Sequence, residues 1–420
     1  MTGTYALVES PVQLLNVLEW AHARTTGRSG PEDGTTAAPG PGPAVTRTPG
    51  EASGPPGPTP GAYVVPGAGP ACTGAPPGTG ASPGTGASPG GAATDQQDEL
   101  TVVVLPPRNA TSRGQLLRMS GLARDEGHRL LWREVRGPAG PGAWPALARL
   151  LRTADRLVVG DPFSRWTQLL LAGSDARHVV VVDDGTATME FTAQLTRGEP
   201  LVRWHRAAAP RGARAALFAP VARRALRGLS PGTGRRVEVF TAMPVEHPPG
   251  VTVTRNDLAW TRSRFGPPQI SPGADLVGTS LVETGVIHED RYLAAVAALA
   301  AGHGVTRYLA HRKEGPEKLR RVAALAGVEI VRPDLPLELV ARSGPIGRRV
   351  LSFPSTVVHT LPLVLRGTAV GVSVCEIQDD WLTERASPRA GGFLAAVSHT
   401  ARGAHGLPVL PVPAPPPSAA

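Results

Sequence analysis

Residues that could carry acid–base and phosphate chemistry follow three apolar runs of this sequence. They are Asp183-Asp184-Gly185 after HVVVV, His311 after TRYLA, and Ser355-Thr356 after RRVLSFP. A carboxylate can take a proton from a hydroxyl, while a histidine and two hydroxyls can hold a departing phosphate. The combination predicts the transfer of a group from a phosphate ester to an acceptor hydroxyl.

Each signature also has a purely structural explanation, and the sequence leaves both open. Asp183 could cap the helix predicted over TATMEF, because an aspartate oxygen accepts from the free N–H groups of a helix start. His311 could be a solvated or core histidine, and Ser355-Thr356 could cap the helix of VVHTLPLVL. Gly185 permits a tight turn or the close approach of a substrate. The strand-end positions favour chemistry, since ligands of open α/β sheets bind there.

Four further residues are weaker candidates for contact with a substrate. Glu338, in DLPLELV, could accept hydrogen bonds from a ribose diol, although it is also an ordinary helix residue. Ser10 and Gln13 lie at the first strand–helix turn, and Asp161 follows the run DRLVV. No histidine spacing suited to a metal, no phosphate-binding P-loop and no nucleophile elbow is present. We therefore predict a site without a metal ion.

The rest of the sequence alternates between short apolar runs and helical patterns, which predicts an α/β fold with parallel sheets. The alternation occurs twice, which indicates two Rossmann-like domains facing across a cleft, the GT-B arrangement. The expected segments are an N-terminal domain of residues 1–25 plus 99–254, a disordered Gly/Pro-rich insertion of 26–98, a linker of 255–274, a C-terminal nucleotide-sugar-binding domain of 275–408, and a disordered tail of 409–420.

Composition excludes several classes of protein. The 420 residues contain only two cysteines, too few for a disulfide framework or a structural zinc site. No apolar run approaches the roughly 18 residues that a membrane span requires. The first residues, MTGTYALVES, lack the basic start of a signal peptide. We therefore expect a cytoplasmic protein.

The formal net charge of +9 favours anionic partners such as nucleotide sugars, acidic glycans, nucleic acids or a phospholipid surface. An arginine-rich stretch over residues 203–236 could contact an anionic glycan or the inner face of the membrane. The alternative is a helix with a solvated arginine face. Aromatic residues make up only 4% and no nucleic-acid-binding motif is visible, so no specific nucleic acid is expected.

At these motifs the chain resembles the bacterial polysialyltransferase-like and lipooligosaccharide sialyltransferase family of glycosyltransferases. ESPVQLLN looks like the opening strand and turn of that family, and GTSLVETGVI, from Gly278, looks like the start of its second domain. The acidic, histidine and hydroxyl motifs occur in the family's order. The resemblance covers nearly the whole chain except the insertion and the tail.

The resemblance implies an inverting GT-B sialyltransferase that uses CMP-sialic acid, or a related CMP-nonulosonate, as donor substrate and needs neither a metal nor another cofactor. It assigns Asp184 as the general base with Asp183 supporting it, His311, Ser355 and Thr356 to the CMP phosphate, and Glu338 to the ribose. The acceptor would be a hydroxyl of a cell-surface glycan. The family histidine is usually followed by proline, whereas Arg312 follows here, which leaves the orientation of His311 open.

Three rival hypotheses remain at this point. A GT-B glycosyltransferase with another nucleotide sugar would place similar acids and a histidine around its cleft. A non-catalytic polyanion-binding protein would account for the positive charge. A paralogue that binds its ligand without transfer would account for the missing proline after His311.

Overall fold

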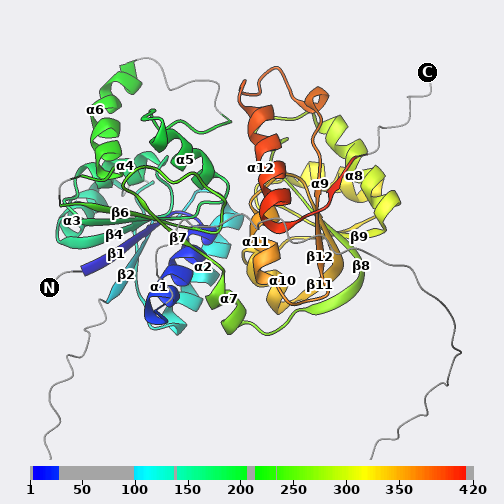
Figure 1. The fold of residues 1–420 in the computed structure, drawn as a ribbon, viewed down its shortest axis with the longest axis horizontal. Coiled ribbons are helices and arrows are strands. Elements are labelled where there is room, and N and C mark those ends of the chain that lie inside the picture. The colour runs from blue at the N-terminus through cyan, green and yellow to red at the C-terminus, as the bar shows by residue number, and fades with distance from the viewer. Residues whose placement is uncertain (1–2, 28–98, 137–139, 206–212, 233, 413–420) are drawn as a thin grey trace, which may run out of the picture. The chain divides into compact units, whose positions relative to one another are not determined.

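The computed structural model describes residues 3–27, 99–136, 140–205, 213–232 and 234–412 (Figure 1). Almost all of the expected disordered insertion, from residue 28 to 98, lies outside these ranges, as does the end of the expected tail. Within the described ranges no helix is long and apolar enough to cross a membrane.

The first sheet has seven parallel strands in the order β3-β2-β1-β4-β5-β6-β7. They are β1 (Gly3–Val8), β2 (Leu100–Val104), β3 (Arg129–Trp132), β4 (Ala154–Val159), β5 (His178–Val182), β6 (Arg236–Thr241) and β7 (Thr252–Arg255). The associated helices are α1 (Pro11–Thr25), α2 (Ala110–Asp125), α3 (Gly140–Arg152), α4 (Arg165–Ala172), α5 (Ala187–Thr196), α6 (Ala213–Gly228) and α7 (Ala259–Arg264).

The second sheet has six parallel strands in the order β10-β9-β8-β11-β12-β13. They are β8 (Gln269–Val277), β9 (Val305–Leu309), β10 (Glu329–Val331), β11 (Pro345–Ser352), β12 (Gly371–Cys375) and β13 (Val409–Leu410). The associated helices are α8 (Glu289–His303), α9 (Pro316–Ala326), α10 (Leu337–Ser343), α11 (Val357–Val364), a 3-10 turn η1 (Asp379–Trp381) and α12 (Ala390–His405).

Counted in chain order within its own half, each sheet begins 3-2-1-4-5-6, the doubly wound Rossmann order. The predicted α/β fold with two Rossmann-like halves is therefore confirmed. In both halves the strand order reverses between the first and fourth strands, β1 and β4 or β8 and β11. These reversal points are where open α/β sheets bind ligands.

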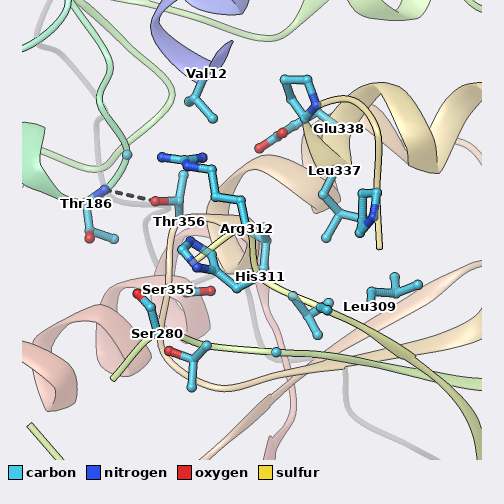
Figure 2. Close-up of a pocket in the computed structure, with 18 of the residues that line it drawn as sticks. Val12, Thr186, Ser280, Leu309, His311, Arg312, Leu337, Glu338, Ser355 and Thr356 are labelled. Carbon is cyan, nitrogen blue, oxygen red and sulfur yellow. Dashed lines mark hydrogen bonds between the residues drawn. The ribbon is translucent and has the colours of Figure 1, made fainter. Parts of the chain in front are cut away.

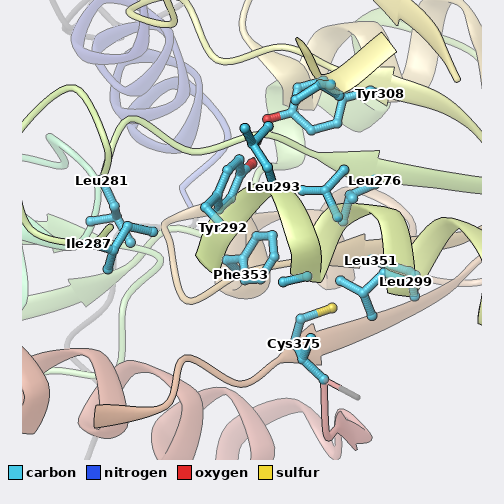
Figure 3. Packing of buried hydrophobic residues seen from close by; sticks show 14 of the residues in the cluster. Leu276, Leu281, Ile287, Tyr292, Leu293, Leu299, Tyr308, Leu351, Phe353 and Cys375 are labelled. Carbon is cyan, nitrogen blue, oxygen red and sulfur yellow. Dashed lines mark hydrogen bonds between the residues drawn. The ribbon is translucent and has the colours of Figure 1, made fainter. Parts of the chain in front are cut away.

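Continuous valine runs form the central strands because helices cover both faces of each sheet (Figure 1). In β2, Val102 and Val104 pack in the cluster that contains Leu14 and Leu18 of α1, while Val103 packs on the opposite face. In the second half, Tyr292 of α8 packs against Phe353 after β11, with ring centroids 5.2 Å apart (Figure 3). Both sheets are thus fixed from two sides, which holds their strand ends in place.

Two expected boundaries differ from the structure. The expected tail of 409–420 contains β13, because Val409 and Leu410 pair with Val374 and Cys375 at the edge of the second sheet. The expected linker of 255–274 contains α7 and the first part of β8. Strand pairing and helix packing, which composition does not reveal, order these short segments.

Candidate functional site

A pocket of about 240 Å³ is lined by residues at the carboxyl ends of strands in both sheets. From the first half come residues such as Val12, Asp184, Gly185 and Thr186, and from the second come Gly278, His311, Arg312, Glu338, Ser355 and Thr356 (Figure 2). The structure therefore brings most of the predicted site residues to one place. Asp183, Ser10, Gln13 and Asp161 are not among the residues that line this pocket.

Asp183 supports the strand end from within the core. It is 2% exposed and accepts hydrogen bonds from the Thr241 hydroxyl and from the backbone N–H of Ala242. Burial raises the pKa of the Asp183 carboxyl to about 6, against the opposing effect of these hydrogen bonds. The alternative that Asp183 caps α5 is wrong, because that helix begins at Ala187 with Thr186 as its N-cap.

Asp184 faces the pocket, and side chains from distant parts of the chain hold its carboxylate. The Gln13 amide donates to Asp184 Oδ1 at 3.0 Å, and Arg203 Nη2 lies 3.5 Å from Oδ2. The turn after β1 orients Gln13. Its side-chain Oε1 accepts from the Glu9 backbone N–H, and its backbone N–H donates to Ser10 Oγ. Ser10 and Gln13 thus orient the acid, a positioning contact that the sequence did not predict.

Asp161 follows β4, the strand that pairs with β5, and forms an acidic cluster with Asp184. It forms an ion pair with Arg203 and accepts from the Phe163 backbone N–H. Burial raises the pKa of the Asp161 carboxyl to about 7; Arg203 opposes this shift and Asp184 adds to it. Arg203 therefore connects the two carboxylates. In the sequence this arginine is one of many in the basic stretch of residues 203–236, and no local signal singles it out.

A second, larger cavity of about 950 Å³ lies against Asp161 and Arg203, on the side of α4 and α6. Its lining combines apolar side chains with arginines and aromatic rings, among them Arg136, Phe163, Arg165, Trp166, Phe218 and Arg223. The guanidinium of Arg165 stacks 5.4 Å from the centre of the Phe218 ring. This cavity suits a ligand with both anionic and apolar parts.

His311, at the end of β9, is neutral in the empty pocket. Burial, together with the smaller effect of the charges on Arg312, Lys313 and Lys318, lowers the pKa of its imidazole to about 3. Its Nδ1 atom accepts from the Lys313 backbone N–H at 3.2 Å, which leaves the proton on Nε2. The neutral ring therefore offers one N–H donor, at Nε2.

A buried network beneath His311 holds the loop in place. The His311 backbone N–H donates to Glu314 at 2.6 Å, and Glu314 also accepts from the Tyr308 hydroxyl. Lys318 lies 2.8 Å from Glu314 in an ion pair that is almost fully buried. The only local sign of this network in the sequence is that Lys313 and Lys318 are the only lysines in an arginine-rich chain.

The Ser355 and Thr356 hydroxyls do not cap α11. The helix begins at Val357 with Thr356 as its N-cap, and no side chain makes a capping hydrogen bond there. Ser355 Oγ lies 3.2 Å from Ser352 Oγ, while Thr356 Oγ1 accepts from the Thr186 backbone N–H at 3.1 Å. Thr356 therefore occupies the N-cap position that the capping alternative predicted, but its hydroxyl makes no capping hydrogen bond and keeps its proton for a ligand.

Gly185 and Glu338 complete the predicted set. Gly185 has a φ of +72°, and a Cβ atom there would lie 2.1 Å from Thr356 Oγ1. Close approach of the two chain segments thus requires glycine. Glu338, on α10, is 3% exposed and accepts from the Thr360 hydroxyl at 2.7 Å. One of its carboxylate oxygens remains for a ligand.

The site offers acid–base groups and hydrogen-bond donors and not a set of metal ligands. The residues that the structure describes contain no group of three or more His, Cys, Asp or Glu side chains that could hold a metal ion. The arrangement can take a proton from a hydroxyl at Asp184 and can donate hydrogen bonds to a phosphate from His311, Ser355 and Thr356.

Comparisons with known proteins give structural likenesses only. No family model matches the sequence, and no curated protein matches it. An α/β-galactoside α-2,3-sialyltransferase from Photobacterium phosphoreum aligns with a TM-score of 0.41 and 8% identity, over 75% of this chain and 91% of that one.

Two further structures align at lower scores. Acinetobacter baumannii MurG has a TM-score of 0.31 and 11% identity, over 75% of this chain and 79% of its own. The Escherichia coli heptosyltransferase WaaC, with ADP-2-deoxy-2-fluoro heptose, has a TM-score of 0.29 and 13% identity, over 73% of this chain and 88% of its own. Similarities this low carry no argument about activity, so the function is argued from the pocket's own residues.

Proposed function

We propose that the chain is an inverting glycosyltransferase that moves sialic acid or a related nonulosonic acid from CMP to a hydroxyl of a cell-surface glycan. The observation that supports it most is the placement of Asp184 from one sheet and of His311, Ser355 and Thr356 from the other around a single pocket. A base and a set of phosphate-binding donors are the two parts that such a transfer requires.

In the proposed reaction, Asp184 removes the proton of the acceptor hydroxyl as its oxygen bonds to the anomeric carbon of the donor. The bond between that carbon and the phosphate oxygen breaks, and CMP leaves with the electron pair. A single displacement of this kind inverts the configuration, by the same geometry as in inverting glycosidases. Asp183 supports Asp184 by holding the strand end in place, because its own carboxylate accepts from Thr241 and Ala242.

The phosphate would be held by neutral donors. His311 Nε2–H and the hydroxyls of Ser355 and Thr356 can donate to its oxygens, and Glu338 can accept from the ribose hydroxyls. As negative charge grows on the departing phosphate, these hydrogen bonds strengthen, and His311 becomes easier to protonate. The site therefore stabilises the leaving group more strongly in the transition state than in the ground state.

The acceptor would approach from the cavity that Asp161 and Arg203 share with the acidic cluster. Its arginines and aromatic rings favour an anionic glycan, and the same side of the chain would face the inner surface of the membrane. Replacing Arg165 and Arg223 together by glutamine should weaken binding to a polyanionic glycan or to anionic vesicles. Unchanged binding would contradict an anionic acceptor on this side.

The test of the proposed donor is a calorimetric titration of CMP, UDP and GDP into wild type and His311→Ala, without added metal. We expect CMP to bind at micromolar concentration and to bind at least tenfold more weakly to the variant, since a charge-assisted hydrogen bond is lost. His399→Ala, at an exposed position on α12, is the matched control.

Each other outcome has a defined meaning. Binding of UDP or GDP in place of CMP would favour another nucleotide sugar and contradict the sialyltransferase assignment. Binding of no nucleotide, with salt-sensitive binding of a polyanion, would favour a non-catalytic protein. CMP binding without turnover of CMP-sialic acid on any acceptor would favour the catalytically silent alternative.

A further inference from the structure

Arg312 is the only arginine or lysine among the residues that line the pocket. In Figure 2 its side chain extends past the His311 ring toward Val12 and Glu338. Within the described part of the chain, its guanidinium has neither an ion pair nor a hydrogen bond, unlike Arg203 and Lys318 nearby. The positive charge of Arg312 is therefore available to an anion that binds in the pocket.

The nearby carboxylates do not serve as that partner. Asp184 already accepts from Gln13 and lies beside Arg203, and Glu338 accepts from Thr360. Burial lowers the pKa of Arg312, and the charges of Asp184 and Glu338 raise it in part. An arginine stays protonated in proteins, so leaving it half-buried and unpaired costs free energy that a bound anion would recover.

The donor phosphate does not need Arg312. His311 and Thr356 already provide two uncharged donors for it, and the Ser355 hydroxyl adds a third when it turns from Ser352 Oγ to the ligand. All three lie at or beside the carboxyl ends of β9 and β11. A CMP-nonulosonate carries a second anion, the carboxylate of its sugar. That carboxylate and the phosphate ester oxygen are attached to the same carbon, so neighbouring residues at one strand end can hold both.

We propose that Arg312 binds the carboxylate of the donor sugar through a two-pronged ion pair and so selects acidic sugars over neutral ones. The planar guanidinium matches a carboxylate in shape and charge, which a lysine does not. This inference rests on the proposed function and adds to it the part of the substrate that the pocket recognises. It also gives a role to the residue that replaces the family's proline.

The test compares two ligands that share the nucleotide but differ in the carboxylate. CMP and CMP-3-fluorosialic acid, which resists transfer, are titrated into wild type, Arg312→Gln and Arg312→Lys. In Arg312→Gln we expect the dissociation constant of the fluorosugar to rise about 10- to 100-fold, the usual effect of losing a charged hydrogen-bonded pair, and that of CMP to stay unchanged. Arg312→Lys should recover only part of the loss.

Arg348→Gln is the charge control, because Arg348 is exposed on β11 and outside the pocket. It should bind both ligands as wild type does. Retained CMP binding by Arg312→Gln also shows that the variant is folded. In turnover, the variant should raise KM for the donor more than it lowers kcat, since the ion pair exists before and during transfer.

Two results would overturn the assignment of Arg312 alone. Equal losses for CMP and the fluorosugar would make Arg312 a phosphate ligand, and no loss for either would remove it from the binding site. If wild type binds neither ligand, both this inference and the proposed function fail. These outcomes separate an error about one residue from an error about the donor.

Discussion

At the carboxyl edge of the first sheet the acidic side chains already have partners within the protein, whereas at the edge of the second sheet two of the donors that face the pocket do not. Asp184 is held by Gln13 and Arg203. Across the pocket, the His311 Nε2–H and the Arg312 guanidinium have no partner among the described residues.

The difference matches what each edge would do in the proposed reaction. A general base must be positioned before its substrate arrives, because a small displacement of a reacting group is costly in rate. A phosphate site can leave its donors open, since the ligand supplies the missing partners. The first edge is thus preorganised by the fold, and the second is completed by the donor.

Asp184→Asn tests the acidic edge and should have the largest effect. We expect turnover to fall about 100- to 10,000-fold, because an amide cannot take the acceptor's proton. CMP binding should be unchanged, since the nucleotide contacts lie on the other edge. Asp175→Asn, with a side chain that is 80% exposed, is the control. A variant that loses CMP binding as well would show that the two edges are not independent.

Glu314→Gln tests what holds the open edge in place. The change removes one charged partner of the Lys318 ammonium, which is 5% exposed and keeps its contacts with Glu283 and the Thr279 carbonyl. We therefore expect a loss of about 2 to 3 kcal/mol in unfolding free energy. Glu317→Gln, which breaks an exposed pair with Arg320 on the same helix, should cost less than about 1 kcal/mol. Urea unfolding measures both, and equal losses would contradict a buried support for His311.

The fold could be predicted from the sequence because it depends on local patterns of residues. Valine runs such as HVVVV form buried parallel strands, and the polar residues that follow them must lie at the carboxyl edge of a sheet. Two rounds of alternation then predict two Rossmann-like halves. This reasoning placed Asp184, His311 and Thr356 on the pocket without any knowledge of the pairing.

The partners of these residues were not accessible, because they depend on long-range packing. Gln13 reaches Asp184 across 171 positions of sequence. Arg203 is one of many arginines, and nothing around it in the sequence marks it as the one between two carboxylates. The same limit applies to β13, a strand of two residues that exists only by pairing with β12.

Gly185→Ala tests the point where the two edges meet. Its φ of +72° and the 2.1 Å between a built Cβ atom and Thr356 Oγ1 predict a cost of about 1 to 3 kcal/mol in unfolding free energy. In a Thr356→Ala background the same change should cost less, because the clash is relieved while the backbone strain remains. A double-mutant cycle measures this coupling, and strictly additive losses would mean that the two residues do not meet in solution.

His359→Phe compares a core histidine with His311 and changes a pH slope that is nearly flat at neutral pH. His359 is fully buried, and burial lowers the pKa of its imidazole to about 3, as it does for His311. Below pH 6.5 the unfolded chain binds a proton that the folded chain does not, so each histidine lowers stability by about 1.4 kcal/mol per pH unit as pH falls from 6.5 toward 3.

Unfolding free energies measured between pH 7.5 and 4.5 should therefore fall less steeply for His359→Phe than for wild type, and likewise for His311→Asn. Comparing slopes, and not absolute stabilities, removes the packing cost of each substitution. If the slope of unfolding free energy against pH becomes shallower for His359→Phe but not for His311→Asn, the His311 ring is in contact with water. That result would contradict a donor site at the second edge from which water is excluded. Equal changes of slope in the two variants would show that the second edge excludes water from His311 as the core does from His359. In such surroundings a hydrogen bond from His311 Nε2–H to an anion is stronger than in water.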